Sequence, residues 1–229
     1  MTSFRFKRFE VKQDRSAMKV GTDGVLLGAW AEGGRRILDV GSGTGLIALM
    51  MAQRFPDAVV DGIDIDCDAC EEARENVLAS PFADRIGILN SRLQDYQAPL
   101  YDAIVSNPPF FVGSLKNPDE KRSMARHTDS LPFNDLFDGV RRLLKPDGVF
   151  SVIVPQEVKE DVVSEGYVVG FRLVRQCAVK TVERKSPKRY LLAFSKGGER
   201  TLVSEEGILN AADGQRSEWY SKLTKDFYL

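Results

Sequence analysis

The chain has 229 residues, of which 43% are hydrophobic, and its formal net charge at pH 7 is -1. This length and composition allow one domain with a sizeable core, and the near-neutral charge argues against a generally basic protein that coats nucleic acid. The three cysteines argue against a secreted disulfide framework, and no apolar run approaches a signal peptide or a membrane span. We therefore expect a cytoplasmic protein that acts as a monomer and has no membrane partner.

Aromatic and basic residues alternate near the N-terminus. The stretch from Phe4 to Lys12 has a period of two, which predicts one strand with one basic face; the basic residues of the stretch include Arg5, Lys7 and Arg8. That face suits either an edge strand protected by charge or an arm that contacts RNA, and the residues leave both interpretations open. Farther along, Thr22 or Asp23 is placed to cap a helix over Gly24–Ala31.

A glycine-rich turn dominates the sequence pattern. An apolar run leads into Asp39-Val40-Gly41-Ser42-Gly43-Thr44-Gly45, and a second apolar run leaves it, which predicts a strand, a turn and a helix. Glycines let the backbone pass close to a ligand, and the helix start offers unpaired N–H groups, so a nucleotide-like ligand is expected. Leu46 stands where the dinucleotide fingerprint needs its third glycine, and the phosphate-binding Gly-Lys-Ser/Thr is absent.

Asp64 narrows the choice of ligand. It ends a second apolar run, nineteen positions after Gly45, where a carboxylate can accept hydrogen bonds from ribose hydroxyls. A ligand with a ribose and no pyrophosphate is required, and S-adenosylmethionine (SAM) fits. Cys67 and Cys70 form a lone Cys-x-x-Cys pair, and His127 is the only histidine, so we expect no metal site.

Strand and helix patterns alternate from residue 36 onward, which predicts an α/β fold with a mostly parallel sheet covered on both faces. Strands are predicted at Arg36–Val40, Val59–Ile63, Ile86–Asn90, Ala103–Ser106 and Val149–Val154, and helices at Leu46–Arg54, Cys67–Ala79 and Phe133–Leu144. Residues 145–148 predict a turn. An antiparallel strand pair, Tyr167–Val179 and Tyr190–Ser195, is expected at the sheet's edge, and the tail from Thr201 to Leu229 is expected to pack back as a strand and a helix.

Asn107-Pro108-Pro109-Phe110 follows a predicted buried strand. Two prolines stop the sheet ladder and stiffen the loop at the strand's end, where open α/β sheets bind ligands. Asn107 brings an amide to that edge, and Phe110 offers a flat face on which a base can stack. Taken alone, the motif favours the simpler interpretation, a rigid turn followed by two core phenylalanines.

Two later clusters are basic. The polar stretch from Gly113 to Leu131 predicts a lid that orders on RNA and carries Lys121, Arg122, Arg126 and His127. A second cluster, with Lys185, Lys188 and Arg189, separates the last two predicted strands. Together with the N-terminal stretch, these clusters are expected near one edge of the sheet, as an RNA-binding surface. Solvated loops are the competing interpretation for both.

The glycine turn and Asn-Pro-Pro-Phe together resemble class I SAM-dependent methyltransferases that methylate planar nitrogens. The block Gln13-Asp14-Arg15-Ser16-Ala17-Met18-Lys19-Val20-Gly21-Thr22-Asp23-Gly24-Val25-Leu26-Leu27-Gly28-Ala29-Trp30 is similar to the N-terminal signature of the bacterial tRNA1(Val) (adenine-37-N6)-methyltransferase family. Ala125-Arg126-His127 and Pro187-Lys188-Arg189-Tyr190-Leu191-Leu192 share that resemblance, which runs from about Phe4 to Leu229.

The resemblance implies a class I methyltransferase Rossmann-like sheet with an antiparallel final strand pair. It also implies that an N-terminal segment, residues 1–35, closes over the site on a core formed by residues 36–229. Lys19 and Thr22 would lie near the methionine carboxylate, with Asp39, Gly41, Gly43, Gly45 and Asp64 around the rest of the cofactor. The resemblance leaves open which residue contacts the SAM adenine. Asp95 lies a few positions after the place where the family has its acidic residue, and Leu93 or Arg92 occupies that place.

The implied reaction is direct methyl transfer to the exocyclic N6 of an adenine in tRNA, with Asn107, Pro108, Pro109 and Phe110 holding the base. Two alternatives remain. The same motif serves enzymes that methylate a protein glutamine, a guanine N2 or DNA adenine. A non-catalytic SAM-binding module is the third possibility, against which the intact motifs argue.

Overall fold

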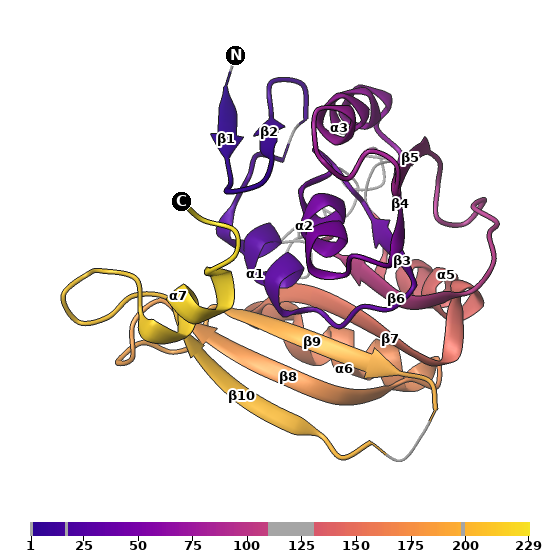
Figure 1. The fold of residues 1–229 in the computed structure, drawn as a ribbon. Helices are drawn as coiled ribbons and strands as arrows, with labels where there is room; N and C mark the ends of the chain where they lie inside the picture. The colour runs from indigo at the N-terminus through magenta and orange to yellow at the C-terminus, as the bar shows by residue number, and fades with distance from the viewer. Residues whose placement is uncertain (1, 17, 110–130, 198–199) are drawn as a thin grey trace, which may run out of the picture.

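An eight-stranded sheet forms the centre of the computed structural model, which describes residues 2–16, 18–109, 131–197 and 200–229 (Figure 1). The strands of this sheet follow the order β10-β8-β9-β7-β6-β3-β4-β5. Their bounds are β3 Arg36–Val40, β4 Val59–Asp64, β5 Ile86–Asn90, β6 Tyr101–Ser106, β7 Leu144–Pro155, β8 Arg172–Lys180, β9 Arg189–Ser195 and β10 Val203–Ile208. The helices are α1 Thr22–Trp30, α2 Leu46–Arg54, α3 Cys67–Leu78, α5 Phe133–Leu143, α6 Lys159–Val168 and α7 Glu218–Thr224, with a short 3₁₀ helix η1 at Gln156–Val158.

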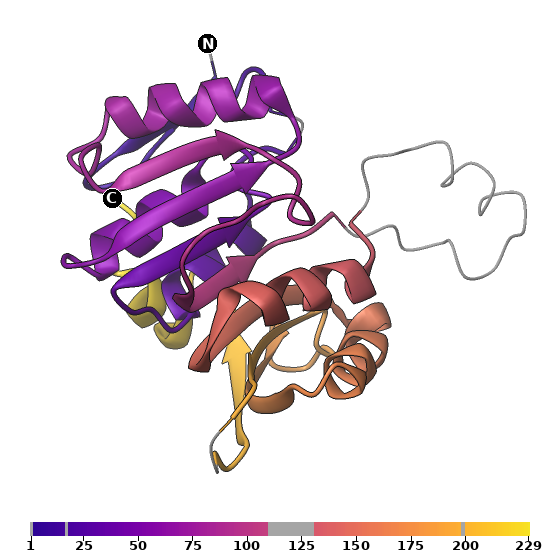
Figure 2. The ribbon, with the colours of Figure 1, turned by 90° about the vertical axis from the view of Figure 1, so that its right-hand side faces the viewer.

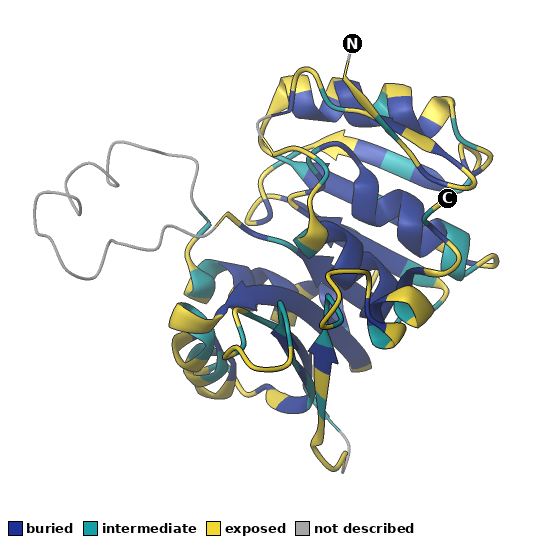
Figure 3. Ribbon diagram, turned by 90° about the vertical axis from the view of Figure 1, so that its left-hand side faces the viewer, coloured by how far each residue is buried: buried dark blue, intermediate teal, exposed yellow. Residues whose placement is uncertain are grey.

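Helices cover both faces of the sheet, as the sequence predicts. Strand residues alternate between two apolar clusters: Ile37 and Val105 pack with α1, α2 and α3, whereas Leu38 and Ile104 pack with α5 and α6. Figure 3 shows the buried residues concentrated on the sheet and on the inner faces of the helices. All neighbouring strands are parallel except at β9, which is antiparallel to both β7 and β8.

The C-terminal third corrects two predictions. Residues 167–168 end α6 instead of beginning a strand, and β8 starts only at Arg172 after a left-handed Gly170 with φ 88°. The antiparallel pair is also not at the edge, because β10 adds a parallel strand outside β8. The tail does form the expected strand and helix, β10 and α7. Sequence patterns miss α6 because its tyrosine and valines resemble a strand.

The edge strand β10 is tied to α1 by a partly buried polar cluster. Trp30 Nε1 donates to Glu205 Oε2 over 3.1 Å, and Arg175 contacts both carboxylate oxygens at 3.1 and 3.0 Å. The guanidinium carbon of Arg175 also lies 4.2 Å from the centre of the Trp30 ring. These contacts fix the helix whose N-terminal end lines the site.

The N-terminal stretch is a hairpin and not the predicted single strand. Strand β1, Ser3–Arg5, pairs antiparallel with β2, Glu10–Lys12. Phe6 and Phe9 turn inward between them, with ring centroids 4.7 Å apart, and Phe6 N–H donates to the Phe9 carbonyl over 2.9 Å. Burial of two phenylalanines three positions apart breaks the period of two.

Two smaller differences concern turns and caps. Strand β7 starts at Leu144, so residues 145–148, predicted as a turn, lie within the strand and form a bulge. Between the pairs Tyr101↔Leu144 and Ala103↔Val149, the chain advances two residues on β6 and five on β7. Helix α1 is capped by Gly21 without a side-chain bond, so neither Thr22 nor Asp23 is the cap; both lie in its first turn.

The carboxyl ends of the parallel strands meet at one edge of the sheet. Figure 2 shows the strands β3, β4 and β5 pointing to the same side of the molecule. The glycine turn, Asp64 and Asn107 follow or end β3, β4 and β6, so the topology places all three at this edge. No helix among the described residues is long and apolar enough to cross a membrane.

Candidate functional site

A cavity of about 1060 Å³ opens at the carboxyl edge of the sheet. Its lining comes from the glycine turn, the ends of β4, β6 and β7, the segment before α1 and the start of α5. The sequence-predicted residues that line it are Lys19, Thr22, Gly41, Gly43, Asp64, Leu93, Asn107, Pro108, Pro109 and Arg189. Residues Phe110, Lys121, Arg122, Arg126 and His127 lie outside the described part of the chain, as do residues 113–130 of the predicted lid; its last residue, Leu131, lines the cavity.

The glycine turn holds its backbone open toward the cavity. Gly41 and Gly43 have φ of 73° and 50°, in the left-handed region that disfavours other residues. A side chain built on Gly41 would meet no described atom within 4 Å, so open space borders the backbone. Gly45, with φ 80°, caps α2 and approaches Ala73; it does not line the cavity.

Asp64 is tied to this turn and still has acceptor capacity. Its Oδ2 accepts from Gly43 N–H over 2.8 Å, and its Oδ1 accepts from Asp66 N–H over 3.0 Å. An ionised carboxylate has about four lone-pair sites, so two hydroxyls can still be bound. The next residue, Ile65, is 44% exposed and lines the cavity, where its apolar surface suits a flat ring.

Asp39 supports the turn from behind. Its side chain is fully buried, outside the cavity lining, and its Oδ2 accepts from Ala48 N–H over 3.1 Å at the start of α2. Its other oxygen has no hydrogen-bond partner among the described residues. Burial raises the pKa of Asp39 to about 7, because desolvation disfavours the charged form and Asp64 adds repulsion.

Asn107 faces the cavity at the end of β6. Ser106 Oγ, one residue earlier, donates to the Val40 carbonyl over 2.8 Å and fixes this strand end against β3. Asn107 Nδ2 donates to the sulfur of Met18 over 3.5 Å. A thioether is a weak acceptor, so a stronger partner can displace this contact.

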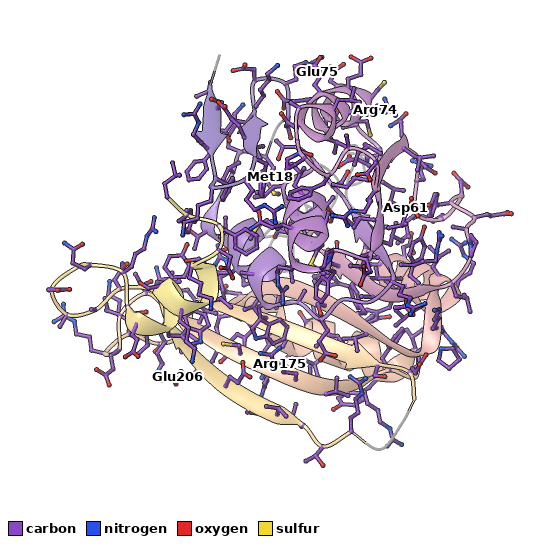
Figure 4. The ribbon with its side chains drawn as sticks, viewed as in Figure 1. Met18, Asp61, Arg74, Glu75, Arg175 and Glu206 are labelled. Carbon is purple, nitrogen blue, oxygen red and sulfur yellow. The ribbon has the colours of Figure 1, made fainter. Side chains whose placement is uncertain are left out.

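Met18 belongs to an N-terminal wall, formed by residues 14–16, 18 and 19, that is anchored on α3. The buried Glu72 carboxylate accepts from the N–H groups of Asp14, Arg15 and Ser16 at 2.6, 2.9 and 2.9 Å. The chain then passes Met18, 46% exposed beside the cavity (Figure 4), and Lys19.

Asn76, also buried, bonds both N–H and C=O of Lys12 and the Thr44 carbonyl. One helix therefore holds both the N-terminal wall and the glycine turn.

The loop after β5 places Leu93 in the cavity lining, together with its neighbours Arg92 and Gln94. Leu93 is 3% exposed and packs against Gly139 of α5. Asp95 does not line the cavity. Gln94 Nε2 donates to Asp135 Oδ2 over 3.0 Å, which joins this loop to the start of α5.

The basic clusters do not all converge. Lys7 and Arg8 lie at the opposite edge of the sheet, with the C-terminal end of α2, where Lys7 Nζ donates to the Lys225 carbonyl over 2.6 Å. Arg5 is exposed and lies 3.7 Å from Glu10. Lys185 and Lys188, by contrast, lie in the loop between β8 and β9, at the carboxyl edge.

Sequence reasoning missed several lining residues, chiefly Ile65, Met18, Asp135 and Glu157. Ile65 had a usable signal, because it follows Asp64 directly in chain order. Met18 likewise directly precedes Lys19, whereas Asp135 and Glu157 come from distant segments that only the fold brings together. Among the described residues, no group of three or more His, Cys, Asp and Glu side chains is placed to hold a metal.

Comparison with known proteins gives consistent matches. The family described as "Methyltransferase small domain" matches residues 18–165. Two proteins named tRNA1(Val) (adenine(37)-N6)-methyltransferase, from Bacteroides thetaiotaomicron and Phocaeicola vulgatus, are 47% and 49% identical, each over 99% of this chain and 97% of the relative.

Solved structures show the same fold. A predicted O-methyltransferase from Agrobacterium tumefaciens has a TM-score of 0.69 at 19% identity, covering 90% of this chain and 96% of that one. The glycopeptide N-methyltransferase MtfA, solved with SAM, has a TM-score of 0.58 at 11% identity and covers 78% of this chain and all of its own.

Proposed function

The chain belongs to the tRNA1(Val) (adenine(37)-N6)-methyltransferase family, and we propose that it methylates N6 of an adenine in tRNA, at position 37 of tRNA1(Val). The observation that best supports this proposal is that Asn107 and Pro108 line the same cavity as the glycine turn and Asp64. An amide that can orient an amino group thus lies beside a site built for a ribose-bearing cofactor.

SAM is the cofactor of this family, and the described residues fit it. The turn leaves open space beside Gly41, and Asp64 keeps lone pairs for ribose hydroxyls. Ile65 and Leu93 offer apolar surface for the adenine ring. We assign the methionine carboxylate to Lys19, Thr22 and the first turn of α1, whose N–H groups have no side-chain cap.

When bound, SAM supplies an electrophilic methyl group on a sulfonium. The exocyclic amine of adenine is a poor nucleophile because its lone pair is delocalised into the ring. The Asn107 side-chain oxygen and the Pro108 carbonyl can each accept one amine N–H bond, which draws the nitrogen toward tetrahedral geometry. The N–C bond then forms as the S–C bond breaks, and the nitrogen releases a proton to solvent. Alignment and local electrostatics provide the acceleration.

Labelled methyl transfer tests the assignment. Unmodified total tRNA, rRNA, DNA and a glutamine-bearing protein are offered separately, and the labelled product is digested and identified. N6-methyladenosine from one tRNA species is expected. Label in protein glutamine, guanine or DNA, with none in tRNA, would keep the cofactor site and overturn the substrate; failure to bind SAM would favour a non-catalytic module.

Two variants test the residues. Asn107→Ala should bind SAM normally and lose most methyl transfer, whereas Asp64→Ala should lose SAM affinity first. Asn134→Ala, an exposed asparagine on α5 outside the cavity lining, is the matched control and should change neither. Full activity of Asn107→Ala would remove the proposed role of that amide.

A further inference from the structure

The cavity continues past Asn107, away from the glycine turn. Asn107 comes directly after β6 in the chain. Across the sheet, β7 and then β9 lie on the side of β6 that faces away from β3 and the glycine turn. Arg189 begins β9, pairs with Pro155 at the end of β7, and both residues line the cavity. With strands spaced by roughly 4.8 Å, Arg189 lies about 10 Å from Asn107 and about 19 Å from Asp64 along the sheet. The cavity therefore has a cofactor half and a second half beyond the reacting nitrogen.

Arg189 is the cation of that second half. The described cationic residues of the lining are Lys19, Arg92 and Arg189. Arg92 follows β5, and Lys19 belongs to the wall anchored on α3, so both lie on the cofactor side of Asn107. An anion that enters with the target base meets Arg189 instead.

Two nitrogens of the Arg189 guanidinium form hydrogen bonds to the protein, and its third nitrogen can still donate to a ligand. Its Nε donates to Asp23 Oδ2 over 2.8 Å, and its Nη1 donates to the Lys188 carbonyl over 2.9 Å. Its Nη2 has no hydrogen bond to a described residue. The two side chains of the ion pair are 38% and 31% exposed, so the pair remains open to an incoming group. A fixed guanidinium with a spare edge is well suited to a phosphate.

The loop before Arg189 extends the positive charge outward from the cavity. Arg184, Lys185 and Lys188 are exposed and form no ion pair with a described residue. Lys188 N–H donates to the Val179 carbonyl over 2.9 Å, and Gln156 N–H donates to the Lys188 carbonyl over 3.2 Å, so this end of the loop is fixed to the sheet. A nucleic-acid backbone can follow these cations into the cavity.

We propose that Arg189, oriented by Asp23, binds a phosphodiester that flanks the target adenosine and so sets the depth at which the base enters. This inference rests on the proposed methylation of tRNA. The distance from Arg189 to Asn107 spans about two strands, which accommodates one nucleoside between its phosphate and its amine. Asp23 keeps the guanidinium extended while the cavity has no RNA in it, so little side-chain freedom is lost on binding.

Neutralising single phosphates tests the contact directly. tRNA1(Val) is assembled with one methylphosphonate at each position around the target adenosine, and kcat and KM are measured with wild type, Arg189→Gln and Arg189→Lys. Arg189→Gln should raise KM for tRNA about tenfold or more and raise the SAM dissociation constant far less, because its partner Asp23 only adjoins Thr22, which is assigned to the methionine carboxylate. One flanking methylphosphonate should impose the same loss on wild type and none on Arg189→Gln.

Controls separate a phosphate contact from damage to the fold. Arg172→Gln removes an exposed arginine at the opposite edge of the same sheet and should leave every parameter unchanged. Arg189→Lys keeps the charge, so part of the KM loss should be recovered; if Arg189→Gln unfolds, the position-specific loss in Arg189→Lys decides. Equal losses in SAM and tRNA binding, or no coupling at any flanking phosphate, would overturn the proposal. If the wild-type enzyme leaves tRNA unmethylated, the proposed function falls first and this inference with it.

Discussion

Glu72→Gln probes how the N-terminal wall is held. The wild-type carboxylate is 1% exposed and accepts three backbone N–H bonds, from Asp14 and Arg15 on Oε1 and from Ser16 on Oε2. Glutamine keeps one acceptor oxygen, so two of these bonds can persist. Its NH₂ group then faces the Ser16 N–H, two donors in a buried place. We expect the free energy of unfolding to fall by about 2–4 kcal/mol, from one lost charge-assisted bond and one unpaired amide.

For a chain of this size that loss lowers Tm by about 5–15 °C, measurable by circular dichroism. SAM affinity should fall too, because Met18 and Lys19 continue the same segment into the cavity. Glu75→Gln, one turn along α3, is the matched control: it removes an exposed ion pair with Arg15 and should lower Tm much less than Glu72→Gln does. A Glu72→Gln protein that melts together with Glu75→Gln would refute the reasoning.

Three further predictions concern the turn and the sheet. The folded-state pKa of Asp39 is about 7, whereas the unfolded carboxyl ionises near 3.8, so between these pH values the folded state binds one more proton and the free energy of unfolding should fall as pH rises from about 4 to 7. In urea titrations Asp39→Asn should flatten that pH dependence, and an unchanged slope against pH would contradict the prediction. Gly43→Ala forces a side chain onto a φ of 50° and should lower the free energy of unfolding by about 1–2 kcal/mol and weaken SAM binding, both measured in one thermal-shift series with and without SAM. A variant that melts at the wild-type temperature in both conditions would argue against strain at this position. Tyr101→Phe removes hydroxyl bonds of 2.7 Å to Asp61 and Tyr96 and should cost about 1–2 kcal/mol with kcat unchanged; a fall in kcat would show that the network reaches the site.

The sequence predicts the centre of the sheet well for a physical reason. Strands β3, β4 and β6 are short apolar runs bounded by glycine, proline or acidic residues, and parallel strands buried on both faces have that pattern. Because their carboxyl ends share one edge, the positions of Gly43, Asp64 and Asn107 follow from the alternation alone. Their roles in binding and catalysis stay proposals.

Other features depend on contacts that no local pattern records. Glu72 looks like a surface residue of a charged helix, and only the fold buries it under the N-terminal wall. The basic alternation suggested that Lys7 and Arg8 join the other clusters, but the inward turn of Phe6 and Phe9 carries them to the far edge. The position of β9 between β7 and β8 is likewise set by long-range pairing.

The N-terminal hairpin has a consequence for the order of folding during synthesis. Lys7 bonds through its backbone to Phe227 and through its side chain to Lys225, 218 residues later in the chain. Residues of the hairpin are therefore made on the ribosome long before the residues that complete their contacts. The β1–β2 pairing itself is local, but loop closure over such a span is slow and entropically costly, so docking of the hairpin on the C-terminal tail is expected as a late event, after the central sheet has formed.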